Sequence, residues 1–142
     1  MSDITIGLLA KESGVRTDTI RYYEQLGLVK PEGRSEAGYR LYGPESILLV
    51  QFIRRAKDLG FKLAEIKTLL TLKASQTATC KDMLERTDHK LAEAKENIKQ
   101  LKNIHDALEK LSEACPGGDM PLSECPILDH LYPKKTKNLR DK

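Results

Sequence analysis

The chain has 142 residues, a formal net charge of +3, and 32% charged against 5% aromatic residues. So few aromatic residues argue against a large internal core, and we expect a small domain plus an extended element that needs a partner. The sequence has no apolar run of about 18 residues and no basic-then-apolar leader, which predicts a soluble cytoplasmic protein without a membrane partner. The bulk charge is weak evidence for nucleic-acid binding, so that role depends on where the charges lie.

Two short amphipathic helices joined by a turn are predicted near the start of the chain. Thr5 is a suitable N-cap for a helix over about 6–12, and Gly14 suits the turn after it. A second helix, over about 17–26, ends at Gly27. This order is typical of a helix-turn-helix, whose second helix can enter a DNA major groove, although many other α-helical domains contain such pairs. The outer face of the second helix carries Arg16, Thr19, Arg21 and Tyr22.

Residues 31–44 (PEGRSEAGYRLYGP) alternate turn residues with aromatic and apolar ones, which predicts a short β-hairpin or wing. Its guanidinium and phenol groups, on Arg34, Tyr39 and Arg40, would suit a phosphate backbone, which such groups bind without reading sequence. The alternative is a solvated turn with ordinary surface arginines.

Two further helices are expected before the middle of the chain. Pro44 can open a helix that ends at Gly60, and another helix follows over about 61–73. Arg54 on the first of them is a candidate DNA contact, with an ordinary solvent-exposed face as the alternative. Residues 74–79 are small and polar, and we interpret them as a linker or the start of the next helix.

A coiled-coil heptad repeat covers residues 80–115. Cys80 and Cys115 lie on one stripe of the repeat, but 35 residues of helix would separate them by about 52 Å, so they cannot share a ligand within one chain. In two antiparallel copies whose paired residue numbers sum to 195, Cys80 lies near Cys115 and Cys125 of the partner subunit, and most seam pairs are apolar. The alternative is an exposed helix with incidental cysteines.

The composition changes at Cys115, where the segment CPGGDMPLSEC begins. Pro116 and the following glycine pair stop the helix, so we expect a loop, a short helix after Cys125 and a disordered basic tail from Pro133. Three cysteines in a reducing compartment favour metal or redox chemistry over a disulfide framework, with three structural thiols as the alternative. The remaining potential ligands are expected to be structural or surface residues: His89, His105 and His130.

Three stretches, IGLLAKESGVRTDTIRYYEQLGLV, RSEAGYRLYGPES and FIRRAKDLGFKLAEIKTLL, together resemble the DNA-binding half of the MerR family of bacterial transcription regulators. The long helix ending in a cysteine loop resembles the metal-responsive members. The resemblance implies a mainly α fold with a winged helix-turn-helix DNA-binding domain at 1–73. A long antiparallel coiled-coil dimerisation helix at 74–114 and a C-terminal metal-binding loop with a basic tail at 115–142 would follow.

The resemblance also implies the function. The implied protein is a homodimer that binds double-stranded promoter DNA and acts together with RNA polymerase. When metal binds, this dimer would distort the DNA and so activate transcription. An enzyme is not expected, because no general base or carboxylate pair accompanies the cysteines. Mapped onto this sequence, the DNA-binding positions are Arg16, Thr19, Arg21, Tyr22, Arg34, Tyr39, Arg40 and Arg54.

The same resemblance places a metal site at Cys115 and Cys125, completed by Cys80 from the partner subunit. Members that select divalent ions carry a cysteine at this last position, whereas the CPGG and CPI segments resemble the copper and gold sensors. Three thiolates favour a divalent heavy-metal ion such as mercury, lead or cadmium. Zinc fits less well because it needs a fourth ligand, for example Asp119, Glu124 or water. A copper(I) sensor and a thiol redox or electrophile sensor on the same scaffold remain the alternatives.

Overall fold

The computed structural model describes residues 3–132, so the expected disordered tail from Pro133 lies outside the described residues. The chain forms two compact units, Met1–Lys90 and Leu91–Lys142. The first unit therefore includes the start of the long helix. The functional division that we predict at residues 73 and 114 stays a prediction.

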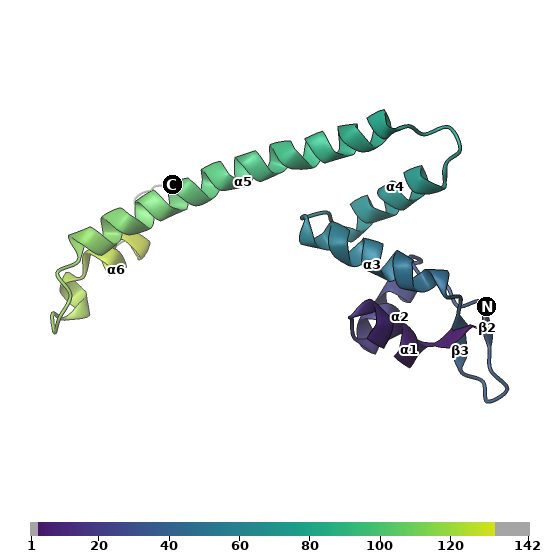
Figure 1. The fold of residues 1–142 in the computed structure, drawn as a ribbon. Coiled ribbons are helices and arrows are strands. Elements are labelled where there is room, and N and C mark those ends of the chain that lie inside the picture. The colour runs from purple at the N-terminus through teal and green to yellow at the C-terminus, as the bar shows by residue number, and fades with distance from the viewer. Residues whose placement is uncertain (1–2, 133–142) are drawn as a thin grey trace, which may run out of the picture. The chain divides into compact units, whose positions relative to one another are not determined.

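The helix-turn-helix is formed by α1 (Ile6–Ser13) and α2 (Thr17–Gln25), close to the predicted bounds. Thr5 caps α1, because its hydroxyl accepts a hydrogen bond of 3.2 Å from the Leu8 backbone N–H. Gly14 has a left-handed backbone (φ 76°) and ends α1, as expected for a glycine C-cap. The two helices lie beside the strands at the N-terminal end of the chain (Figure 1).

A three-stranded antiparallel sheet in the order β1-β3-β2 forms the wing. β2 (Gly33–Arg34) and β3 (Arg40–Tyr42) make the predicted hairpin, with Arg34 opposite Arg40. β1 (Ile4–Thr5) pairs with the other edge of β3 and leads directly into α1. The third strand was not predicted, because two residues are too few to show an alternating pattern.

The core of the first unit joins the wing, the helix-turn-helix and two more helices, α3 (Glu45–Asp58) and α4 (Leu63–Ala74). Burying these apolar side chains supplies the main favourable free energy of folding. Seven large side chains are fully buried: Leu9, Ile20, Val29, Tyr42, Val50, Ile53 and Ile66.

The first turns of α5 (Cys80–Ala114) belong to this unit through contacts with α4. The Lys90 ammonium lies 2.8 Å from Glu65 Oε1 and 5.4 Å from the centre of the Phe61 ring, and the Lys90 side chain is only 11% exposed. The same Glu65 oxygen accepts a hydrogen bond of 2.7 Å from the Lys62 backbone N–H. Met83 packs against the core. One carboxylate thus joins the N-terminus of α4 to α5.

The second unit contains the rest of α5, the 3-10 turn η1 (Leu122–Glu124) and α6 (Pro126–Leu131). α5 ends at Ala114, and Gly117 and Gly118 both have positive φ, so the predicted helix stop is confirmed. The short helix expected after Cys125 is also present. Within residues 3–132, no helix is both long and apolar enough to cross a membrane.

Replacing Glu65 by Gln should weaken the attachment of α5. The bond from the Lys62 N–H, then that from Lys90, lowers the pKa of Glu65 from the ordinary value of 4.5. Its stabilisation is therefore complete above that value and is lost as the pH falls through the lower, folded pKa. We expect Glu65→Gln to lower the Tm by about 1–2 °C at pH 7.

Thermal melts from pH 3 to pH 7 would check this, with Glu85→Gln as the matched control because Glu85 is an exposed carboxylate of α5. The Tm difference between wild type and Glu65→Gln should shrink at acid pH. A difference that stays constant over this range would contradict the assignment.

Candidate functional site

The outer face of α2 carries the residues that the sequence places on a recognition helix. Arg21 and Tyr22 are exposed, and Thr19 is half-buried. Asp18 lies between two of the arginines: Arg21 Nη1 is 3.4 Å from one of its oxygens, and Arg16 Nη2 is 3.9 Å from the other. These exposed ion pairs hold the guanidinium groups loosely, because such pairs are weak in water.

The wing presents its polar groups around a tight tip. Arg34 Nη1 donates a hydrogen bond of 2.8 Å to the Gly38 carbonyl, and the Tyr39 N–H donates one of 3.1 Å to Ser35 Oγ. The Tyr39 side chain itself is 70% exposed. The tip is therefore held by its own hydrogen bonds while its phenol remains available.

A hollow of about 550 Å³ lies between α2 and the wing. Three guanidinium groups line it, and converging cations of this kind attract a phosphate-bearing ligand. The structure thus brings Arg21 together with three residues of the predicted wing set, while Arg16, Thr19, Tyr22 and Arg54 are not part of the lining. The full lining is Thr5, Ile6, Arg21, Arg34, Gly38, Tyr39, Arg40 and Tyr42.

Glu24 is a residue of this surface that the sequence analysis missed. The Tyr42 hydroxyl donates a hydrogen bond of 2.5 Å to Glu24 Oε1, and Arg40 Nε lies 3.3 Å from Glu24 Oε2. Burial, and then the bond to the carboxylate, raises the pKa of Tyr42 to about 12, so the phenol stays a neutral donor at ordinary pH. The two motifs RYYE and GYRLY contain all three residues, but helical or strand periodicity cannot link segments this far apart.

Arg54 has a structural partner that its surface position did not suggest. Its Nη1 donates a hydrogen bond of 3.0 Å to the Gly14 carbonyl in the turn between α1 and α2. A Cβ atom at residue 14 would lie 2.6 Å from this nitrogen and would displace the end of the Arg54 side chain, while the left-handed backbone itself favours glycine there. Arg54 thereby ties α3 to the helix-turn-helix.

The three cysteines are free thiols in three different settings. Cys80 opens α5 and is exposed, whereas Cys115 and Cys125 are half-buried. Cys115 follows the end of α5, where its N–H donates a hydrogen bond of 3.2 Å to the Leu111 carbonyl. Cys125 lies between η1 and α6. Because α5 is one helix of 35 residues, a length of about 52 Å, the cysteines at its two ends need a second chain to share an ion.

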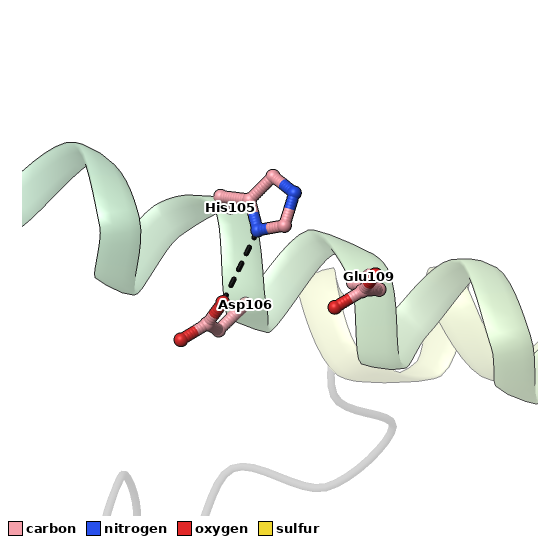
Figure 2. Close-up of side chains that lie close together, drawn as sticks. All are labelled: His105, Asp106 and Glu109. Atoms are coloured by element: carbon pink, nitrogen blue, oxygen red, sulfur yellow. Dashed lines mark hydrogen bonds and ion pairs between the residues drawn. The ribbon is translucent and has the colours of Figure 1, made fainter.

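A different group of potential ligands is close together on α5. His105, Asp106 and Glu109 place one donor atom each within 4.8 Å of one another, the only such group of three found in residues 3–132. Figure 2 shows them along one stretch of the helix, with His105 Nδ1 3.1 Å from Asp106 Oδ1. All three are exposed, and such groups are common on solvated helices, so the arrangement alone does not define a metal site.

A helix-turn-helix followed by a β-hairpin, with arginines around the hollow between them, defines a winged helix-turn-helix DNA-binding protein. The family model described as "MerR HTH family regulatory protein" matches residues 4–73, and "MerR, DNA binding" matches residues 48–111. The chain belongs to the MerR family of transcription regulators, which are not enzymes.

Several relatives of this chain are named for a response to metals. It is 41% identical to the mercuric resistance operon regulatory protein of Bacillus cereus, over 91% of this chain and 97% of that protein. It is 37% identical to heavy metal-dependent transcription regulator 2 of Rhizobium meliloti, over 90% of this chain and 86% of that protein. The crystal structure of PbrR691 from Ralstonia metallidurans in complex with lead(II) matches with a TM-score of 0.79 and 30% identity, over 90% of this chain and 98% of that one. The protein is a metal-responsive transcriptional regulator.

Replacing Arg54 by Met should destabilise the fold because the Gly14 carbonyl loses its charged donor. We expect the free energy of unfolding to fall by about 1 kcal/mol relative to Arg55→Met, which removes the same charge from the neighbouring exposed position. Urea unfolding followed by circular dichroism would measure both variants. Equal stability of the two would show that the Arg54 bond contributes nothing.

Proposed function

We propose that this protein binds a promoter operator as a homodimer and activates metal-resistance genes by distorting the DNA when a divalent thiophilic ion binds. The ion would be mercury, lead or cadmium, with zinc less well suited. The observation that carries this proposal is α5: a single helix with no buried residue, an exposed apolar stripe, and a cysteine at or next to each end.

The exposed stripe supports an antiparallel dimer. Apolar side chains at coiled-coil spacing favour a second helix, because exposed apolar area of this size is unfavourable in water. In the register in which paired residue numbers sum to 195, most seam pairs are apolar and both ends of the pair become equivalent. The apolar residues of the stripe that are at least 50% exposed are Leu84, Leu91, Ile98, Leu101, Ile104 and Leu108.

The same register supports a metal site shared by two subunits. It brings Cys80 to Cys115 and Cys125 of the partner subunit, and three thiolates are a donor set for soft ions. A bound ion supplies a strong cross-link between the loop of one subunit and the helix start of the other. Mercury and lead need only the three sulfurs, and the mercuric resistance and lead(II) relatives agree with this choice. Zinc would need Asp119, Glu124 or water as a fourth ligand.

Metal would control transcription through the arrangement of the two DNA-binding units. Each unit contributes the exposed groups of α2 and the wing, and Arg54 of α3, to DNA contact. An ion that binds one relative arrangement of the units better than another shifts the population toward it. That arrangement would bend and untwist the promoter so that RNA polymerase can use it. The proposed DNA contacts remain Arg16, Thr19, Arg21, Tyr22, Arg34, Tyr39, Arg40 and Arg54.

The Cys80→Ser variant tests the choice of a divalent ion. We expect wild type to bind about one ion per three-cysteine cluster from a panel of Hg(II), Pb(II), Cd(II) and Zn(II), and the variant to bind at least tenfold more weakly. Mass spectrometry of the equilibrated protein and competition with a thiol chelator would give stoichiometry and affinity. His105→Ala should bind like wild type, because the exposed group on α5 is not the proposed site.

Full-strength divalent binding by Cys80→Ser would overturn the proposal. If the variant instead retains copper(I), which two sulfurs can hold, and wild type prefers that ion, the copper(I) alternative is correct. A thiol redox or electrophile sensor would show one rapidly alkylated cysteine that metal does not protect.

The Leu101→Glu variant tests the dimer. Leu101 is 64% exposed in the single chain and would face Ala94 in the proposed seam, so a symmetric dimer would bury two unpaired carboxylates. We expect the dimer dissociation constant to rise at least tenfold, measured by sedimentation equilibrium. Gln100→Glu adds the same charge at an exposed position off the stripe and should leave association unchanged. Equal association of both variants with wild type would rule out this seam.

A further inference from the structure

We propose that Glu24 is a positioning residue for DNA binding, which fixes the wing relative to the recognition helix and holds the Arg40 guanidinium at the hollow. The proposal rests on the proposed DNA face of α2 and the wing. It does not depend on which metal the protein senses.

Both oxygens of the Glu24 carboxylate are used by the same strand. Oε1 accepts from the Tyr42 hydroxyl and Oε2 lies beside Arg40 Nε, while the Glu24 side chain is only 19% exposed. Arg40 and Tyr42 are two residues apart on β3, so their side chains lie on the same face of the strand. Because β3 is the central strand of the wing, a carboxylate that holds β3 fixes the whole sheet against α2.

Burial of an apolar core does not explain this arrangement. The ring of Tyr42 is fully buried and a phenylalanine would fill the same space, yet the hydroxyl and the carboxylate must both lose water to meet. A carboxylate beside a phosphate-binding surface also repels DNA. The Glu24 carboxylate is therefore unfavourable both for desolvation and for DNA attraction, so we expect it to have another role. Here that role is to orient the wing and Arg40.

The group that Glu24 orients is the Arg40 guanidinium. The Glu24 contact uses Arg40 Nε, which leaves the two Nη groups, with four N–H donors, for another acceptor. The Arg40 side chain is 45% exposed and lines the hollow together with Arg21 and Arg34. A guanidinium held at one edge loses less conformational freedom when its other edge binds a phosphate.

The proposal predicts opposite effects on two kinds of DNA. Removing the carboxylate charge should not weaken general attraction to phosphates and can strengthen it. Losing the fixed wing should weaken binding to a duplex that requires the correct spacing of α2 and the wing. Specific affinity should therefore fall while non-specific affinity does not, a separation that a loss of folded protein would not produce.

The experiment uses the full-length protein without metal. A tight-binding duplex is first selected from a randomised library with wild type, and affinities are then measured by fluorescence anisotropy on this duplex and on a scrambled one of equal length. We expect Glu24→Gln and Glu24→Asp each to lose about tenfold on the selected duplex, with no loss on the scrambled one. The Asp variant keeps the charge but is too short to hold both partners.

Two further variants make the result unambiguous. Tyr42→Phe changes no charge and keeps the ring, so it should show the same selective loss, and it serves if the Glu24 variants fail to fold. Glu36→Gln removes an exposed carboxylate from the wing tip and should lose no affinity for either duplex. Wild-type affinity of Glu24→Asp and Tyr42→Phe for the selected duplex, or equal losses on both duplexes, would overturn the positioning role. If Arg40→Ala also binds like wild type, the proposed DNA face is wrong as well.

Discussion

The property on which this molecule depends is the exposed apolar stripe of α5. No residue of α5 is fully buried, so beyond its first turns this 35-residue helix gains little stability from its own chain, since most helix stability in proteins comes from packing an apolar face. The compact first unit, by contrast, has its own core of aliphatic and aromatic residues drawn from β1, β3 and the helices. One sequence therefore combines a small DNA-binding unit that has its own core with a long helix whose apolar stripe packs against a second chain in the proposed dimer.

Single hydrogen bonds to backbone groups at the helix ends hold much of this geometry. Thr5 caps α1, Arg54 binds the carbonyl of the turn that follows α1, and Glu65 caps α4 while it also binds the Lys90 ammonium of α5. The Arg54 bond joins α3 to the turn after α1, and the Glu65–Lys90 bond joins α4 to α5, so the positions of these elements relative to the core depend on a few polar side chains. The apolar core supplies most of the stability of the unit, and these polar groups add to it while they fix where the parts lie.

The sequence predicted most of the fold, because most of its signals are local. The cap at Thr5, the turn at Gly14 and the stop after Cys115 depend on residues within a few positions of one another, and all three are confirmed. β1 was not predicted because it is only two residues long. The contact of Glu24 was not predicted because its partners lie on another element. For the candidate site, the cysteines and wing arginines were identifiable by residue type and family motif, whereas the partners of Arg40 and Arg54 required coordinates.

Cys80 lies in the first compact unit, whereas Cys115 and Cys125 lie in the second, which matters when two different variants form one dimer. In the proposed dimer every ion is held by the helix start of one subunit and the loop of the other, so neither subunit alone contains all the ligands of a site. Two inactive proteins, one lacking only Cys80 and the other lacking only Cys115 and Cys125, would then form a heterodimer in which one of the two ends is intact. Intersubunit complementation of this kind would distinguish a shared site from any arrangement in which each chain binds metal alone, and metal would stabilise the dimer by mass action.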